Sequence, residues 1–106
     1  MFQPHRYTRT QLCFEDFLGA FHDADSVIVT DIYPAGEKEL KGVNAERLAE
    51  GIRKQGHREV HHIQEFSEIV AQLMEVCHEG DMVLTLGAGD VYRVGEMLLE
   101  GLQHRD

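Results

Sequence analysis

The feature that most constrains the fold of this 106-residue sequence is the alternation of β-branched runs with helical patterns from residue 26 onward. Residues 26–32 read Ser-Val-Ile-Val-Thr-Asp-Ile and lead into Tyr-Pro-Ala-Gly, a pattern typical of a buried strand that ends in a loop. Residues 82–86 predict a second buried strand, and residues 59–63 predict a short one between them. Because strands separated by helices are usually parallel and joined by crossovers, the sequence predicts a layered α/β fold with a mostly parallel sheet.

The helix between the first two predicted strands has clear boundary signals. Asn44 is a good N-cap for a helix over residues 45–54, and Gly56 is suited to end it. Val43 and Leu48 stand at the spacing of a hydrophobic staple around that cap. Two later helices are predicted over residues 66–77 and 91–102, where apolar residues recur at three- and four-residue steps.

The beginning of the chain departs from this alternation. Residues 10–22 predict a helix whose apolar face carries Phe14, Phe17, Leu18 and Phe21, yet only Met1 and Phe2 precede it where a feeding strand should end. We therefore expect residues 1–106 to form a single but partial domain, with its first strand and helix missing.

Composition narrows the classes of function. A net charge of −9 argues against general binding to nucleic acid or to anionic membranes, and no apolar run approaches membrane-spanning length. No signal peptide is predicted at the amino terminus. Cys13 and Cys77 lie in apolar helical patterns without C-x-x-C spacing, which predicts buried free thiols in a cytoplasmic protein.

The first candidate site lies in residues 4–9, Pro-His-Arg-Tyr-Thr-Arg. Arg6 and Arg9 stand three residues apart near a helix start, for which Thr8 or Thr10 is a candidate cap. Two guanidinium groups beside a helix N-terminus would hold a carboxylate or a phosphate. From these residues alone, two solvated arginines at a helix start are the more common arrangement.

A second candidate follows the first predicted strand. Asp31 and Tyr33 come at its carboxyl end, where α/β folds place functional groups. A turn that merely ends the strand, with Pro34 and Gly36 serving backbone geometry, explains the pattern about as well.

The third candidate is the turn after residue 86. Gly87 and Gly89 permit close backbone approach, and Asp90 is a plausible cap for the helix that follows. A lone G-x-G is a weak signal of anion binding, so a plain strand-to-helix turn is favoured.

Metal binding and unaided catalysis are not predicted. The adjacent His61 and His62 point to opposite faces of a strand, and no Cys or His set has zinc-ligand spacing. The sequence contains no phosphate loop, no G-x-S-x-G and no H-E-x-x-H motif.

Three segments together resemble the Mur ligases. Residues 2–10 resemble the family's F-Q-P-H-R-[YF]-[TS]-R-T segment, residues 31–37 its D-[IV]-Y-x-A-G-E loop, and residues 86–91 its final G-A-G-[DN]-[IV] turn. The segments occur in the family's order and spacing over essentially the whole chain. The first segment favours the branch that adds L-alanine to UDP-N-acetylmuramate over the related ligases that recycle murein tripeptide.

The resemblance implies a Rossmann-like, three-layer carboxy-terminal domain, without the D-[DY]-[YG]-[AG]-H-H-P segment that opens it. In the family this domain closes over an amino-terminal domain that holds the UDP-sugar and a central domain that carries the ATP phosphate loop. The implied reaction uses ATP and Mg²⁺ to activate the carboxylate of UDP-N-acetylmuramate for attack by L-alanine in peptidoglycan precursor synthesis. The chain alone is then expected to be inactive.

The resemblance also implies roles for individual residues. His5, Arg6 and Arg9 are expected to contact the alanine carboxylate or the acyl phosphate. The amino-acid pocket is expected to be bordered by Asp31, Tyr33 and Ala35, and the cleft rim by Gly87, Gly89 and Asp90. Alternatives are a free-standing α/β module that binds an anion or nucleotide, a purely structural module, and the same domain of a murein tripeptide ligase.

Overall fold

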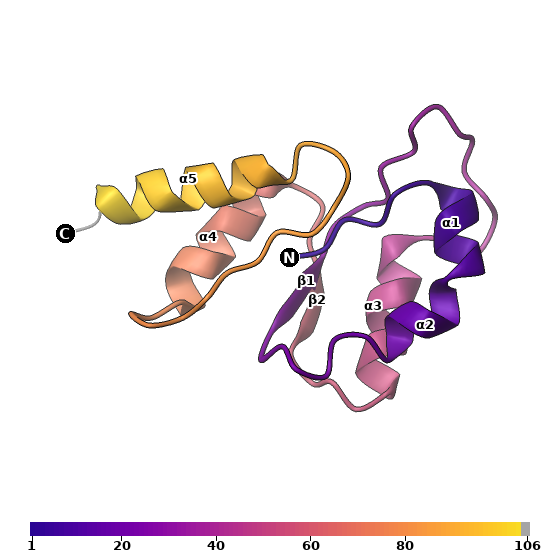
Figure 1. Ribbon diagram of the computed structural model, residues 1–106, viewed down its shortest axis with the longest axis horizontal. Helices are drawn as coiled ribbons and strands as arrows, with labels where there is room; N and C mark the ends of the chain where they lie inside the picture. The colour runs from indigo at the N-terminus through magenta and orange to yellow at the C-terminus, as the bar shows by residue number, and fades with distance from the viewer. Residues whose placement is uncertain (105–106) are drawn as a thin grey trace.

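The computed structural model describes residues 1–104 and shows an α/β arrangement in which helices flank a small sheet on both sides (Figure 1). Helices α1, α2 and α3 lie on one side of the strands, and α4 and α5 lie on the other. In chain order, the elements are α1 (Tyr7–Leu12), α2 (Phe14–Leu18), β1 (Val27–Val29), α3 (Ala45–Lys54), β2 (Val60–His62), α4 (Phe66–Val76) and α5 (Tyr92–Gln103).

Strands β1 and β2 pair in parallel, with Val27 opposite Val60. The amino-terminal residues extend this ladder on the other side of β1: the Phe2 nitrogen donates to the Ile28 oxygen at 2.7 Å. Beyond them, the Gln3 nitrogen donates to the Leu86 oxygen at 2.9 Å, and both bridges of Phe2 are parallel. The parallel sheet expected from the sequence is therefore confirmed, with Phe2 between β1 and the segment that contains Leu86.

Alternating side chains of β1 divide the apolar core into two clusters. Val27 and Val29 pack with the buried residues of α3, while Ile28 packs on the other face with residues of α4 and α5. Burying each such side chain stabilises the fold by roughly 1.5–3 kcal/mol. The result is the three-layer, Rossmann-like architecture that the sequence predicts.

The predicted helix over residues 10–22 is wrong in its bounds. The helical segment begins at Tyr7, is interrupted at Cys13 and ends at Leu18. The change of direction at Cys13 lets the second segment place Phe17 against Phe2, with ring centroids 5.1 Å apart in an edge-on arrangement. The predicted apolar face is confirmed, because all four of its members pack on the core cluster below α3: Phe14, Phe17, Leu18 and Phe21.

The predicted buried strand at residues 82–86 is also wrong. This segment forms no regular strand: it pairs with residues 1–3 through backbone hydrogen bonds at Leu84 and Leu86 and one bridge at Leu86, and Met82 and Leu84 are 83% and 58% exposed. It lies at the edge of the ladder, where only Val83 among its alternating residues packs against the core beneath α4 and α5. One face of residues 82–86 therefore packs against the core, and the other face is exposed to solvent.

Predicted helix caps were right in one place and wrong in another. The Asn44 side chain accepts a hydrogen bond from the Arg47 nitrogen at 2.8 Å, which confirms the cap of α3. Asp90 makes no side-chain cap of α5; its backbone oxygen instead accepts from the Arg93 nitrogen at 3.0 Å. An extra turn thus places Val91 at the cap position of α5.

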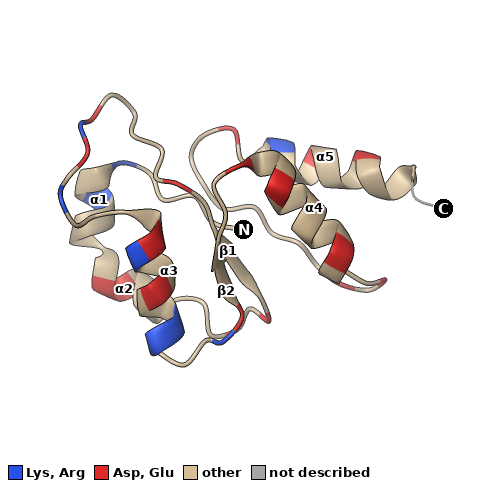
Figure 2. Ribbon diagram, turned by 180° about the vertical axis from the view of Figure 1, so that it is seen from behind, with Lys and Arg blue, Asp and Glu red and all other residues tan. Residues whose placement is uncertain are grey.

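The two cysteines are free but half-buried rather than fully buried. Burial nevertheless raises the pKa of the Cys77 thiol, with a smaller contribution from Asp81. The acidic residues are spread over several helices, and the basic ones occur on separate elements rather than in one patch (Figure 2). No helix within residues 1–104 has the length and apolar character needed to cross a bilayer.

Candidate functional site

The first and second sequence motifs pair directly beyond the end of β1. His5 and Tyr33 form a parallel bridge, in which the Tyr33 nitrogen donates to the Pro4 oxygen at 2.9 Å. The Arg6 nitrogen donates in turn to the Tyr33 oxygen at 2.7 Å. The rings of His5 and Tyr33 stack with centroids 5.7 Å apart and planes 9° from parallel. The segments around His5 and Tyr33, almost thirty residues apart in sequence, therefore form one continuous surface.

The third motif packs against the same surface. A β-carbon placed on Gly89 would lie 3.6 Å from the Tyr33 ring and 3.5 Å from Gln3 Oε1. A β-carbon on Gly87 would lie 3.1 Å from Val91 and 3.3 Å from the β-carbon of Gln3, which is tighter than ordinary contact. The structure thus brings His5, Tyr33 and the turn of residues 87–89 together at the carboxyl end of the parallel ladder.

Arg6 has an unusual backbone conformation. Its φ of 65° and ψ of 144° lie in a region that residues with a β-carbon rarely adopt, and such strain costs about 1–3 kcal/mol. The buried Thr10 holds this conformation, because its hydroxyl and its backbone nitrogen both donate to the Arg6 oxygen, at 2.7 and 3.1 Å. Thr10 therefore anchors Arg6 and does not cap α1, contrary to the sequence-based expectation.

The start of α1 is capped from a distant loop. Glu37 accepts hydrogen bonds from the Thr8 nitrogen at 3.1 Å and from the Thr8 hydroxyl at 2.6 Å. The hydroxyl bond and then the backbone bond of Thr8 lower the pKa of the Glu37 carboxyl, and the charge of Arg6 adds to this. The predicted capping role of the Thr8 side chain is therefore wrong, since its hydroxyl is a donor to Glu37.

Ala35 contributes backbone geometry to the same loop. It is exposed and has a φ of 50°, and Gly36 follows with a φ of 88°. These two left-handed residues turn the chain back toward α1 and so present Glu37 to Thr8. The binding role expected for Ala35 stays a prediction.

The side chains of Arg6 and Arg9 are both exposed. Neither guanidinium makes a hydrogen bond or an ion pair within residues 1–104. Both are therefore available to an anionic ligand, although this availability does not show that they bind one.

Asp31 is paired with a residue that sequence reasoning did not select. His62 Nε2 lies 2.6 Å from Asp31 Oδ1, and both side chains are partly exposed. The pair closes the carboxyl ends of β1 and β2, because Val29 is in register with His62. Parallel register was the available signal, since it brings the residue after one strand beside the end of the next. His61 points elsewhere, 3.6 Å from Glu59.

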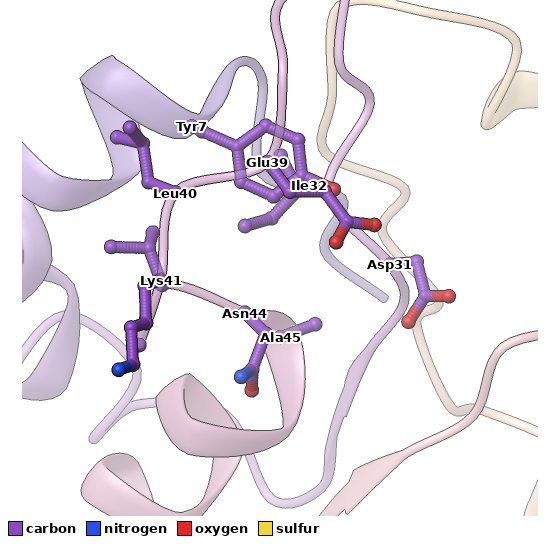
Figure 3. A pocket seen from close by; sticks show the side chains of 10 residues that line it. Tyr7, Asp31, Ile32, Glu39, Leu40, Lys41, Asn44 and Ala45 are labelled. Carbon is purple, nitrogen blue, oxygen red and sulfur yellow. The ribbon is translucent and has the colours of Figure 1, made fainter.

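A hollow of about 480 Å³ opens between α1 and the start of α3 (Figure 3). Among the predicted site residues only Asp31 lines it, together with Glu39 and Tyr7. Burial, and then the charges of Glu39 and Asp31, raise the pKa of the Tyr7 hydroxyl. The charged side chains that line the hollow are the carboxylates of Asp31 and Glu39 and the ammonium group of Lys41.

Known proteins match this chain over the region that contains the three motifs. Residues 3–89 match the family described as Mur ligase, glutamate ligase domain. The chain is 54% identical over 106 residues to a UDP-N-acetylmuramate–L-alanine ligase of Syntrophotalea carbinolica, covering 100% of this chain and 23% of that protein. It is 56% identical over 103 residues to the ligase of the same name from Syntrophus aciditrophicus, covering 97% of this chain and 22% of the relative.

A similarly named protein of Geotalea daltonii is 50% identical over 103 residues, with the same shares covered. The chain therefore spans less than a quarter of the length of these relatives. The match covers the Gln3 segment, the Asp31 loop and the turn up to Gly89, which are the segments that meet at the end of the ladder. By its sequence, the chain belongs to the Mur ligase family.

Proposed function

We propose that this chain is the substrate-closing, carboxy-terminal part of an ATP-dependent ligase that joins L-alanine to UDP-N-acetylmuramate in peptidoglycan precursor synthesis. The supporting observation is the 50–56% identity, over nearly the whole chain, to proteins that carry this name. The convergence of the three motifs around His5 and Tyr33 agrees with a role for this end of the ladder in binding.

The chemistry of such a ligase explains why arginines would be needed. ATP converts the muramic-acid carboxylate into an acyl phosphate, the alanine nitrogen attacks its carbonyl carbon, and phosphate leaves. Both the phosphate and the alanine carboxylate carry negative charge in a site from which water is excluded. Fixed guanidinium groups lower the energy of that charge and orient both partners.

Arg6 and Arg9 suit this role for two structural reasons. The backbone of Arg6 is held by Tyr33 on one side and Thr10 on the other, which fixes the origin of its side chain. Arg9 lies three residues further along, within α1, so that both arginines belong to one short segment at the start of this helix. Each guanidinium can hold a carboxylate or phosphate through two parallel hydrogen bonds.

The other substrates are assigned to the remainder of the full-length protein. Within residues 1–104, no group of three His, Cys, Asp or Glu side chains is arranged to hold a metal ion. Mg²⁺ and the ATP phosphates would accordingly be bound by other domains, and we propose that the isolated chain is inactive. The free cysteines fit a cytoplasmic enzyme.

The test uses the full-length protein with ATP, UDP-N-acetylmuramate and L-alanine. Arg6→Ala and Arg9→Ala should each reduce turnover by orders of magnitude without loss of fold, because each removes charge from the transition state. Arg58→Ala is the matched control, since Arg58 is exposed and precedes β2 at the opposite end of the ladder. Wild-type rates in both test variants would refute the site. Faster ligation of a murein tripeptide than of L-alanine would refute the substrate.

A further inference from the structure

Gln3 carries a buried oxygen that has no hydrogen-bond partner among residues 1–104. The residue is only 9% exposed, its Nε2 donates to the Asp31 backbone oxygen at 3.2 Å, and its Oε1 accepts nothing. The bond to a carbonyl oxygen fixes the orientation of the amide, because a rotated amide would set two oxygens against each other. Buried acceptors are nearly always satisfied, so one left open calls for a functional explanation.

The unpartnered Oε1 of Gln3 faces the turn of residues 87–89. Gly89 lies between Gln3 Oε1 and the Tyr33 ring, since its missing β-carbon would stand 3.5 and 3.6 Å from them. The backbone N–H groups of Gly87, Ala88 and Gly89 donate no hydrogen bond within the described part of the chain. A shift of this turn would therefore break no hydrogen bond donated by these groups.

We propose that Gln3 Oε1 accepts the ammonium group of the amino-acid substrate, and that Gly89 determines specificity by leaving room for it. This rests on the proposed function and deepens it by assigning the amine end of the amino acid. An amide oxygen is a strong acceptor for an ammonium group, and the neighbouring Tyr33 ring attracts a cation to its face. The assignment concerns binding and involves no covalent step.

The position of Gln3 near Arg6 also suits the carboxylate group of an amino acid. Ammonium and carboxylate groups are separated by one carbon atom, so a site for both needs an acceptor and a cationic donor close together. Arg6 follows Gln3 by three residues, and its left-handed φ of 65° breaks the alternation of side chains that a fully extended segment would impose. The exposed Arg6 guanidinium would then meet the carboxylate while Gln3 meets the ammonium.

The first variant is Gln3→Met in the full-length protein, which keeps the length of the side chain and removes the acceptor. The KM for L-alanine should rise about tenfold or more, as expected for a hydrogen bond to a charged group. The KM for ATP should stay within about twofold, because the proposal places the amino acid, and not ATP, at Gln3. The Tm should change little, since loss of the Nε2 bond to the Asp31 oxygen is offset by removal of an unsatisfied buried oxygen. A lower Tm with equal losses for both substrates would show a structural role and overturn the proposal.

The second variant is Gly89→Ala, whose methyl group fits at ordinary contact distance but covers the oxygen. It should raise the KM for L-alanine as Gln3→Met does. Gly95→Ala on α5 is the control, because its added methyl group meets nothing and the KM should not change. A wild-type KM in Gly89→Ala overturns the ammonium site while leaving the ligase function intact. A wild-type protein that cannot ligate L-alanine overturns both.

Discussion

Glu37 and Thr8, which are far apart in sequence, are joined by two hydrogen bonds in which a single carboxylate serves a backbone N–H and a hydroxyl group. The contact ties the loop after β1 to the first turn of α1. That turn carries the two arginines, so the loop helps to set their position. Because the contact depends on a charge, it should respond to pH.

The first prediction concerns this pH dependence. The pKa of Glu37 lies below its ordinary value of 4.5 because the ionised form is favoured by the bonds from Thr8. Its stabilising contribution is therefore complete above pH 4.5 and is lost as the pH falls through the lower folded pKa. Thermal unfolding of Glu37→Gln should show less loss of Tm over this acidic range than the wild type. Glu96→Gln, which removes another exposed carboxylate, should behave as the wild type does.

A second prediction follows from the strained backbone of Arg6. Arg6→Gly should raise the free energy of unfolding by about 1 kcal/mol, because glycine relieves the strain but has more freedom to lose on folding. Arg6→Ala retains a β-carbon and should bring no such gain. Chemical denaturation measures both, while ligation by the full-length protein should fall in each case. Equal stabilities of the glycine and alanine variants would contradict the strain.

The pair of Asp31 and His62 gives a third prediction. A double-mutant cycle of Asp31→Ala and His62→Ala should yield a coupling free energy of about 0.5–1 kcal/mol, as expected for a partly exposed hydrogen bond. Additive losses in the double variant would mean that the 2.6 Å contact contributes nothing to stability. The cycle with Glu59 in place of Asp31 and His61 in place of His62 is the control, and its coupling should be smaller.

The fourth prediction compares two leucines with the same substitution. Leu48→Ala should lower the free energy of unfolding by about 2–5 kcal/mol, because this side chain of α3 is fully buried. Leu84→Ala should change it by less than about 0.5 kcal/mol, because Leu84 is 58% exposed at the edge of the ladder. Similar losses in both variants would show that residues 82–86 belong to the core after all.

Local signals account for the parts of the fold that the sequence predicted well. Asn44 caps α3 through a bond to its near neighbour Arg47, and α4 follows an apolar periodicity within one segment. Such features depend on residues close in sequence, so they can be recognised without a structure. The motifs around His5, Tyr33 and Gly89 could likewise be recognised from residues close in sequence. Their contact with one another could not be predicted from the spacing of the motifs along the chain.

The features that were missed depend on contacts between distant residues. The break at Cys13 accompanies the packing of Phe17 against Phe2, which is distant in sequence. Leu84 is exposed because it lies at the edge of the ladder. His62 and the open oxygen of Gln3 carry no local signature at all, because each gains its meaning from Asp31 and Gly89 across the sheet. The parallel sheet could be predicted from the sequence, but the residue pairs across it could not.

The separation of the two core clusters by β1 has a consequence for how this domain tolerates change. The cluster on one face packs α2 and α3 against the strands, while the cluster around Ile28 packs α4 and α5 on the other face. Volume changes in groups that share no neighbours combine additively, so substitutions around Leu98 should not propagate to the packing around Leu48. Core substitutions beneath α4 and α5 should therefore leave the packing of α2 and α3 unchanged, whereas the turn of residues 87–89, which leads directly into α5, remains coupled to that side.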